Sequence, residues 1–484
     1  MTDTTNATPQ DLQQRYRQAL ATLERYEQAH LLHYYHELEP AQQAALLSDI
    51  EAQDWQELHT LAEQYVLSDY SPEVPEKLEP PAYYPALPDE SLRPRYQEAK
   101  RLGESLLRQG QVAAFTVAGG QGTRLGWDGP KGSFPATPLQ GKPLFQVFAE
   151  YIRKTQAKYQ CRLPWYIMTS PLNHEPTQAL FAEYNYFGLE PEDVMFFQQG
   201  TLPSFSVDGK VLLADKHQLA QNPDGHGGSF SALHRSGALE DMRQRGVSHI
   251  SYFQVDNPNV KCLDPLFIGL HVQDDAGMSS KMLPKAEAKE RVGVFCEVDG
   301  RVQVIEYSDL PDELAEARAD DGGLRYKAGS IAIHMISVAF AQSLIAADGR
   351  LGLPLHRAVK KVPYLDIASG QHIEPEEPNA VKLERFVFDA LPLSASSVIL
   401  ETERLEEFAP IKNAEGSDSP ATSQALQSQR AARWLAQHGV ALPAEDAPLP
   451  VIELSPLLAI DAEDLAEATL PARIAPGQDL LLEP

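Results

Sequence analysis

Apolar residues recur at helical spacing in the first part of the chain. Between about residues 9 and 69, large apolar side chains return every three or four positions among glutamate, glutamine and alanine. The members of this stripe are Leu32, Leu38, Leu46, Leu47, Ile50, Trp55, Leu58 and Leu61. This period is typical of amphipathic helices that bury one face. Seven prolines then fall within residues 71–94, which predicts an extended linker, and a further helix is expected at about 94–109, ended by Gly110.

The hydrophobic pattern changes after residue 112. Short apolar runs, such as VAAFTVA at 112–118 and WYIMT at 165–169, alternate with segments of helical pattern. This alternation predicts an α/β fold whose mostly parallel sheet is covered by helices. Residues 291–307 differ, because two strand patterns flank Asp299-Gly300, a dipeptide typical of tight hairpin turns. We therefore expect an antiparallel insertion there, and beyond about residue 391 a polar loop followed by a helical, proline-rich tail.

Composition excludes some classes of protein. Lys and Arg number 41 against 68 Asp and Glu, which leaves a net charge of −27. Non-specific nucleic-acid binding needs a basic surface, so an acidic chain argues against it, and an anionic ligand would need a local basic pocket. Cys161, Cys262 and Cys296 are far apart and odd in number, which argues against a disulfide framework or a cysteine zinc site. Without a signal-peptide pattern or a membrane-length apolar stretch, a cytoplasmic location away from membranes is expected.

A glycine-rich segment, GGQGTRLGWDGPKG at 119–132, follows the first apolar run. Glycines allow a backbone to approach a phosphate closely and to point N–H groups at it. The dinucleotide fingerprint G-x-G-x-x-G fails, because Leu125 stands at the third glycine, and the P-loop pattern fails because Ala136 replaces its first glycine. A third interpretation is a loop that binds a nucleoside triphosphate, with Arg124 and Lys131 neutralising its phosphates. The alternative is a tight turn with incidental charges, but six glycines in fourteen residues would then destabilise the chain without any gain.

A second candidate site lies where the apolar run ISYFQVD ends in Asp256, followed by Asn257. A carboxylate at the carboxyl end of a strand lies in the crevice where α/β sheets bind ligands, and Mg²⁺ takes one or two carboxylates together with phosphate oxygens. The alternative is that Asp256 only caps the turn that follows.

Several motifs together resemble the eukaryotic-type UDP-sugar pyrophosphorylase family, most closely its UDP-N-acetylglucosamine pyrophosphorylases. They occur in the family's order within roughly residues 30–430: GGQGTRLGWDGPKG, FFQQGTLP, NPDGHGG, FQVDNPNV, VQVIEYSDL, LRYKAGSIAIH, AVKLERFVFD and EFAPIKNAEG. The resemblance implies a Rossmann-like, GT-A-like nucleotidyltransferase fold with a central mixed sheet. It also implies a helical N-terminal region with the linker at 1–104, a catalytic domain at 105–390 and a small C-terminal domain at 391–484.

The resemblance implies an activity as well. Members of the family convert UTP and a sugar 1-phosphate to a UDP-sugar and pyrophosphate. The attacking sugar-phosphate oxygen is already an anion, so the reaction needs alignment and charge neutralisation instead of a protein nucleophile. Its implied cofactor is Mg²⁺, held by Asp256, and its partners are UTP and the sugar 1-phosphate.

The same resemblance assigns site residues. The catalytic residues are Arg124, Lys131 and Lys412. The nucleotide-binding residues are Ala118, Gly119, Gly120, Gly122, Thr123, Gln199, Gly225 and His226. The sugar-binding residues are Asn257, Glu306, Tyr307, Gly329, Ser330 and Phe386.

The chain differs from the N-acetylglucosamine enzymes at His226, Ser330 and Ile333, where they carry asparagine. These differences leave the sugar open, with N-acetylglucosamine 1-phosphate favoured and glucose or galactose 1-phosphate as the alternative. An alternative of another class is a nucleotide-sugar-binding protein that has lost catalysis. The charged residues at the candidate site argue against it, since a degenerate enzyme would be expected to lose some of them.

Overall fold

The computed structural model describes residues 8–70, 74–75, 77–444 and 450–484. The described residues form two compact units. Unit 1 is drawn from residues 1–73, 200–228 and 354–386, and unit 2 from residues 74–199, 229–353 and 387–484. The division into 1–104, 105–390 and 391–484 stays a prediction from the sequence.

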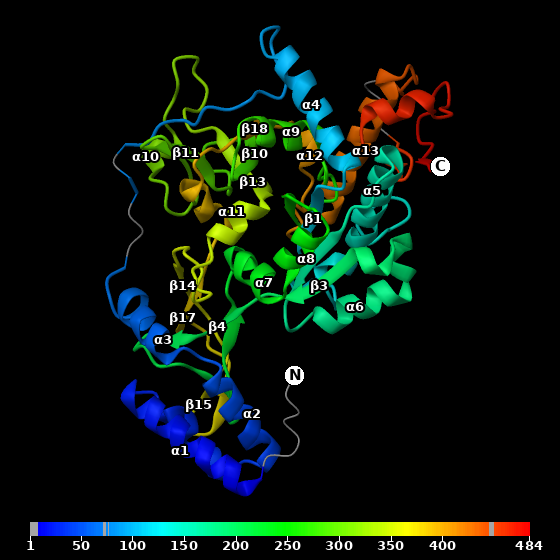
Figure 1. Cartoon of the computed structure of the whole chain (residues 1–484). Coiled ribbons are helices and arrows are strands. Elements are labelled where there is room, and N and C mark those ends of the chain that lie inside the picture. The colour runs from blue at the N-terminus through cyan, green and yellow to red at the C-terminus, as the bar shows by residue number, and fades with distance from the viewer. Residues whose placement is uncertain (1–7, 71–73, 76, 445–449) are drawn as a thin grey trace. The chain divides into compact units, whose positions relative to one another are not determined.

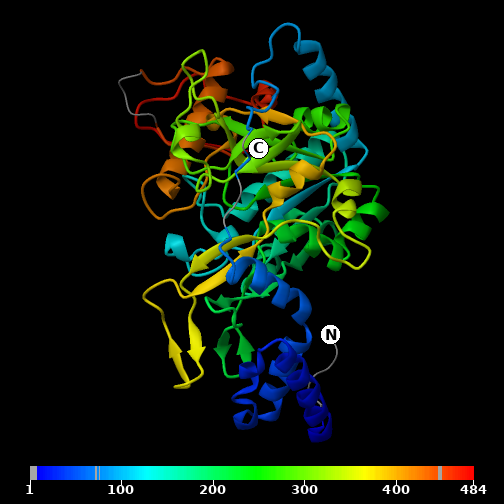
Figure 2. The same ribbon diagram turned by 90° about the vertical axis from the view of Figure 1, so that its left-hand side faces the viewer.

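Unit 1 contains the predicted N-terminal helices. Its helices are α1 (Pro9–Arg25), α2 (Pro40–Glu51) and α3 (Trp55–Leu61). Its strands are β4 (Thr201–Pro203), β5 (Phe205–Ser206), β6 (Leu213–Asp215), β7 (Gln218–Leu219), β8 (Gln221–Pro223), β14 (His356–Lys360), β15 (Tyr364–Asp366), β16 (Gln371–Ile373) and β17 (Ala380–Glu384). The leucine stripe is buried against Phe205, Val381 and Leu383, so helices and strands share one core. The β15–β16 hairpin is yellow in Figure 2.

Unit 2 holds the alternating strands and helices (Figure 1). Its strands are β1 (Val112–Val117), β2 (Trp165–Thr169), β3 (Val194–Gln198), β9 (His249–Gln254), β10 (Met278–Pro284), β11 (Val294–Val298), β12 (Arg301–Ile305), β13 (Ala328–Ser337), β18 (Ile399–Glu401), β19 (Ile452–Leu454) and β20 (Leu480–Leu482). Its helices are α4 (Arg93–Arg108), α5 (Leu144–Tyr159), α6 (His174–Glu183), α7 (Ser229–Arg235), α8 (Ala238–Gln244), α9 (Pro265–Gln273), α10 (Asp312–Ala315), α11 (Val338–Ser343), α12 (Arg404–Glu407) and α13 (Pro420–Gln437).

The central sheet of unit 2 is mixed, as predicted. Its strand order is β12-β11-β13-β9-β1-β2-β3, and β10 pairs with β13 and β18. Strands β9, β1, β2 and β3 run parallel, so their carboxyl ends meet at one edge. Strand β13 is antiparallel to β9 and to β11. The antiparallel insertion is confirmed, because β11 and β12 form a hairpin in which Asp299 and Gly300 both have positive φ.

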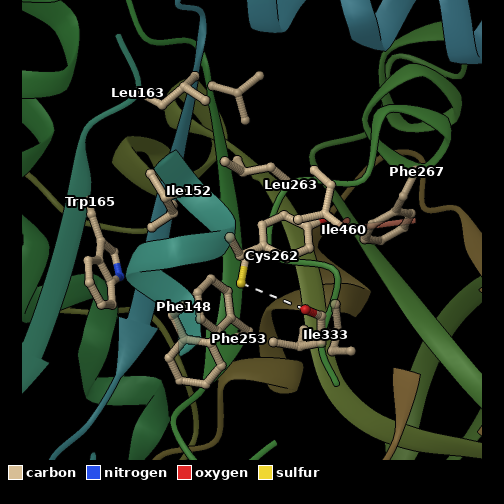
Figure 3. Packing of buried hydrophobic residues seen from close by; sticks show 14 of the residues in the cluster. Phe148, Ile152, Leu163, Trp165, Phe253, Cys262, Leu263, Phe267, Ile333 and Ile460 are labelled. Atoms are coloured by element: carbon tan, nitrogen blue, oxygen red, sulfur yellow. Dashed lines mark hydrogen bonds between the residues drawn. The ribbon is translucent and has the colours of Figure 1, made fainter. Parts of the chain in front are cut away.

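Close packing on the sheet follows from small and aromatic side chains. A Cβ on Gly103 of α4 would lie 1.9 Å from the carbonyl oxygen of Pro265 in α9, so these helices approach at a distance that only glycine allows. Figure 3 shows the rings of Phe148 and Phe253 side by side, and they meet edge to face with their centroids 5.2 Å apart. Helix α4 confirms the helix predicted after the linker, and Gly110 follows its end at φ 67°.

Candidate nucleotide-binding and catalytic site

The glycine-rich loop begins where β1 ends and closes on itself. The Ala118 N–H donates to the Met168 carbonyl at 2.7 Å, which ties the start of the loop to β2. The Gly122 N–H donates to the Gly129 carbonyl at 3.0 Å, and the Lys131 N–H donates to Gly120 at 3.1 Å. The two sides of the loop are therefore joined by backbone hydrogen bonds, which hold Lys131 beside the glycines.

Asn173, which the sequence analysis did not single out, braces this loop. It is fully buried at the start of α6. Its Nδ2 donates to the carbonyls of Ala118 at 2.9 Å and of Gly120 at 3.1 Å. Its Oδ1 accepts hydrogen bonds from the N–H and the hydroxyl of Ser170. An asparagine that follows a strand and precedes a helix was the only sequence signal, and it is equally typical of an ordinary helix cap.

The Asn173 amide also sets the direction of the loop N–H groups. In a trans peptide, the carbonyl of one residue and the N–H of the next point in opposite directions. Because the carbonyls of Ala118 and Gly120 point at Asn173, the N–H groups of Gly119 and Gln121 point away from it. Within the described part of the chain, these two N–H groups have no hydrogen-bond acceptor. Paired, outward-pointing N–H groups in a glycine loop are an anion-binding arrangement.

Gln199 lies directly against the first glycine of the loop. Its N–H donates to the Thr169 carbonyl at 2.8 Å, so the carboxyl ends of β2 and β3 are joined. A Cβ built on Gly119 would lie 2.3 Å from Gln199 Oε1, which explains why glycine is needed there. The structure therefore brings together two of the residues predicted to bind the nucleotide, on adjacent strand ends.

Lys131 and Asp256 form the charged centre of this edge of the sheet. Lys131 Nζ lies 3.6 Å from Asp256 Oδ2, and their side chains are only 17% and 15% exposed. Asp256 follows β9, which pairs with β1 in parallel, so sheet topology places the two residues side by side. Arg124 is exposed on a short 3₁₀ turn within the loop, next to the exposed Thr123.

Lys412 is anchored near Asp256 through the backbone. The Ile411 N–H donates to the Asp256 carbonyl at 2.8 Å, so Lys412 follows a residue in contact with the candidate metal ligand. Lys412 Nζ lies 3.8 Å from Asp418 Oδ2 and 5.4 Å from the ring centre of Phe408. Its side chain is 41% exposed, which leaves the ammonium group accessible.

The amide of Asn257 is largely occupied by the chain itself. Its Nδ2 donates to the Glu407 carbonyl at 2.6 Å, and its Oδ1 accepts from the Ala409 N–H at 3.0 Å and the Asn259 N–H at 3.2 Å. Only one amide hydrogen remains for another partner. Asn257 thus joins the end of β9 to the segment that leads to Lys412, and its predicted sugar contact stays a prediction.

Glu306, Ser330 and Gly329 gather at the β11–β13 part of the sheet. A Cβ on Gly293 would lie 3.1 Å from Glu306 Oε1, and the Gly293 carbonyl accepts the Ser330 N–H at 2.7 Å. Gly293 is therefore a common neighbour of the carboxylate and of Ser330, which is half-buried. Tyr307 is 48% exposed beside Glu306. Gly329 pairs with both Leu283 and Val294, between neighbouring strands.

The other predicted site residues belong to unit 1. Gly225 has φ 84°, and a Cβ there would lie 2.3 Å from the Arg385 carbonyl oxygen. The Phe386 ring stacks with the rings of both His226 and His356, with centroid distances of 5.2 and 4.2 Å. Burial, and secondarily the neighbouring His356, lowers the pKa of His226 to about 4, so His226 is neutral at pH 7.

A parallel sheet edge that carries a glycine loop and paired charges defines a nucleotide-binding protein of the nucleotidyltransferase class. The family model described as UTP–glucose-1-phosphate uridylyltransferase matches residues 56–457. The chain belongs to this family of UDP-sugar pyrophosphorylases.

Individual relatives are similar over most of their length. The human UDP-N-acetylhexosamine pyrophosphorylase-like protein 1 is 39% identical over 477 residues, which cover 92% of this chain and 93% of that protein. The UDP-N-acetylglucosamine pyrophosphorylase of Saccharomyces cerevisiae is 38% identical over 80% of this chain and 82% of its own. The crystal structure of the Trypanosoma brucei uridine diphosphate N-acetylglucosamine pyrophosphorylase has the same fold, with a TM-score of 0.77 at 24% identity and 99% coverage of both chains. No helix within the described ranges combines the length and apolar character that crossing a bilayer requires.

Proposed function

We propose that this protein is a uridylyltransferase that converts UTP and N-acetylglucosamine 1-phosphate to UDP-N-acetylglucosamine and pyrophosphate. The observation that carries the proposal is the largely buried ion pair of Lys131 and Asp256. It lies at the carboxyl edge of the sheet, beside a glycine loop whose N–H groups point outward. The two substrates bring several negative charges together, and this pair supplies a cation and a metal-binding carboxylate where the phosphates would lie. The names of the human and yeast relatives support the N-acetylated sugar.

The predicted residues divide between the triphosphate, the uracil, the sugar phosphate and the sugar. The N–H groups of the glycine loop and the cations Arg124 and Lys131 bind the triphosphate, while Gln199 contacts the uracil and the backbone of Gly225 lies against its ring. Lys412 draws the sugar phosphate toward the α-phosphorus and lowers the repulsion between the two substrates. The hydrogen-bonding groups of Glu306 and Ser330 face the sugar. Gly225, His226 and Phe386 complete the nucleotide and sugar contacts.

Mg²⁺ is the proposed cofactor, and the donor set fits a metal shared with the substrate. Among the residues that the structure describes, no group of three His, Cys, Asp or Glu side chains is arranged to hold a metal. Asp256 offers one partly exposed carboxylate, which suits Mg²⁺ because this ion usually takes few carboxylates and completes its shell with phosphate oxygens and water. When bound, it would neutralise charge on the phosphates, and Lys131 would exchange its contact with Asp256 for one with the nucleotide.

The test is pyrophosphate release from UTP and Mg²⁺ with a panel of sugar 1-phosphates. We expect the highest kcat/KM with N-acetylglucosamine 1-phosphate. Absence of release with every sugar, from protein that still binds UTP, would contradict catalysis and favour a binding protein.

Glucose 1-phosphate is the second candidate, and Ser330 is the observation that favours it. A serine side chain is shorter than asparagine and offers one hydroxyl where the related enzymes have an amide. A pocket that selects the N-acetyl group must satisfy its amide, because an unsatisfied buried amide costs about 1–3 kcal/mol. A ratio of kcat/KM that favours glucose by more than about 100-fold, about 2.7 kcal/mol, would promote this candidate over the first.

The cytoplasmic location stays a prediction.

A further inference from the structure

A largely buried ion cluster, in which the Asp264 side chain is 14% exposed, adjoins the segment that carries Lys412. The Lys281 side chain is fully buried, and its Nζ lies 2.6 Å from Asp264 Oδ2 and 2.7 Å from both carboxylate oxygens of Glu407. Glu407 also accepts hydrogen bonds from the Thr402 hydroxyl at 2.7 Å and from the Lys261 N–H at 3.3 Å. These contacts saturate the carboxylate of Glu407, which is 2% exposed.

The two carboxylates of the cluster favour the protonated form of Lys281. Burial alone would lower the pKa of Lys281, but Asp264 and Glu407 raise it above its ordinary value. Burying three ions requires a large loss of hydration, and well-packed apolar residues often stabilise a fold as well as a buried ion pair does. A gain in stability therefore explains such a cluster poorly. A fixed geometry for the backbone attached to it explains it better.

From Glu407 the chain is held at alternate residues up to the position before Lys412. The carbonyl of Glu407 and the N–H of Ala409 are both bound by the Asn257 amide, and the N–H of Ile411 is bound by the Asp256 carbonyl. The Ala409 carbonyl also accepts from the Ser423 hydroxyl at 2.6 Å. This series of backbone hydrogen bonds begins at Glu407, in the buried cluster, and ends at Ile411, the residue before Lys412.

We propose that Glu407, held by Lys281, is a positioning residue that aligns Lys412 with Asp256 for the transfer step. This inference rests on the proposed function, because it assigns Lys412 to the phosphates. Lys281 fixes the carboxylate of Glu407, the carboxylate fixes the backbone of residues 407–411, and that backbone fixes the origin of the Lys412 side chain. Neither Glu407 nor Lys281 contacts a substrate in this scheme.

The strand that carries Lys281 supports the same interpretation. Strand β10 has an irregularity between Ser280 and Met282, so Lys281 leaves the regular pairing with β13 and turns into the cluster. The residues on either side of it pair with His334 and Ser330 of β13. Strand β10 therefore anchors the Lys412 segment through the side chain of Lys281, and it anchors the segment around Ser330 through its backbone pairing with β13.

The experiment is a double-mutant cycle with Glu407→Gln and Lys412→Ala. The matched control is Glu150→Gln, because Glu150 pairs with Lys142 in another ion cluster that is nearly as buried, at 5% and 8% side-chain exposure. We expect both glutamine variants to lower Tm, but only Glu407→Gln to lower kcat, by about 30-fold or more. In the Lys412→Ala background, Glu407→Gln should lower kcat by less than 3-fold, because the ammonium group that Glu407 positions has already been removed.

Several results would overturn the inference. An equal loss of kcat in the two glutamine variants would assign the loss to general destabilisation. A full, multiplicative loss in the Lys412→Ala background would show that Glu407 acts independently of Lys412. If Glu407→Gln does not fold, Thr402→Val tests the same carboxylate more mildly, and its loss of kcat should likewise disappear in the Lys412→Ala background.

Failure of the proposed function would be recognised separately. In that case the wild-type protein would release no pyrophosphate with any sugar 1-phosphate. The positioning claim would still be tested by hydrogen exchange, which should be faster at the Ile411 amide in Glu407→Gln than in wild type. Unchanged exchange at that amide would contradict the inference whatever the activity.

Discussion

Replacing Asn173 by aspartate tests whether the loop N–H groups bind the triphosphate. The substitution keeps the shape of the side chain and keeps an acceptor for Ser170. It replaces the Nδ2 donor by an oxygen that faces the carbonyls of Ala118 and Gly120, which Nδ2 meets at 2.9 and 3.1 Å. The two carbonyls would then rotate away, and the N–H groups of Gly119 and Gln121 would turn with them.

The magnitude follows from those two contacts. A hydrogen bond contributes about 0.5–1.5 kcal/mol net, and a buried carbonyl left without a donor costs about 1–3 kcal/mol. A loss of about 2–3 kcal/mol in UTP binding corresponds to about a 30- to 150-fold increase in the dissociation constant. Calorimetric titration with UTP measures this directly, and steady-state kinetics should show a larger increase in KM for UTP than for the sugar 1-phosphate.

Two variants separate loop geometry from added charge. Asn173→Ala removes the donor without adding a carboxylate, and it should still weaken UTP binding about 10-fold or more. Asn379→Asp is the matched control, because the Asn379 amide bridges the N–H and carbonyl of Val362 in unit 1. That variant should lose stability and keep UTP affinity. A folded Asn173→Asp protein that binds UTP within 3-fold of wild type would refute the assignment of the loop.

Four further substitutions address the remaining assignments. Lys131→Ala should lower kcat/KM for UTP by about 100-fold or more with an unchanged circular dichroism spectrum, and unchanged UTP kinetics would count against the triphosphate role. Asp256→Ala should lose metal-dependent turnover by orders of magnitude in a Mg²⁺ titration, and near-normal activity would exclude it as the metal ligand. Ser330→Asn should raise the kcat/KM ratio for N-acetylglucosamine over glucose 1-phosphate about 10-fold, whereas an unchanged ratio would remove Ser330 from the sugar pocket. The pKa of His226 is lowered from 6.5 to about 4 in the folded protein, so the unfolded state binds a proton first and the free energy of unfolding falls as the pH drops below about 6.5. Between pH 7 and 5, the free energy of unfolding measured with denaturant should therefore fall by about 2 kcal/mol less in His226→Asn than in wild type. An identical fall in both proteins would contradict a buried, neutral His226.

Local elements were predictable because their causes lie within a few residues of sequence. The leucine stripe, the helix before Gly110 and the Asp299-Gly300 hairpin depend on side-chain period and on turn chemistry. The glycine loop was recognisable because six glycines after a strand are unfavourable unless a ligand or a close approach requires them. The family followed from the order of the motifs, and comparison with known proteins confirmed it.

Contacts between distant segments could not be predicted in the same way. Asn173 carries no signal that distinguishes a helix cap from a brace of the glycine loop, because its two carbonyl partners lie more than 50 residues away in sequence. Lys281 is likewise an ordinary lysine in the sequence, and its burial with Glu407 depends on a strand pairing with β18 that no local pattern encodes.

The sequence alone indicated the class of protein, through the order of strands and helices, the glycine-rich loop predicted to bind phosphate and the residue types suited to uridylyl transfer. Which of these residues meet depends on the folded chain, as the 3.6 Å contact between Lys131 Nζ and Asp256 Oδ2 illustrates. The physical reason is range. Helix period, turn preference and glycine freedom act over a few residues, whereas charge pairing and burial act through space, and the parallel register of β1 and β9 places residues 125 positions apart side by side.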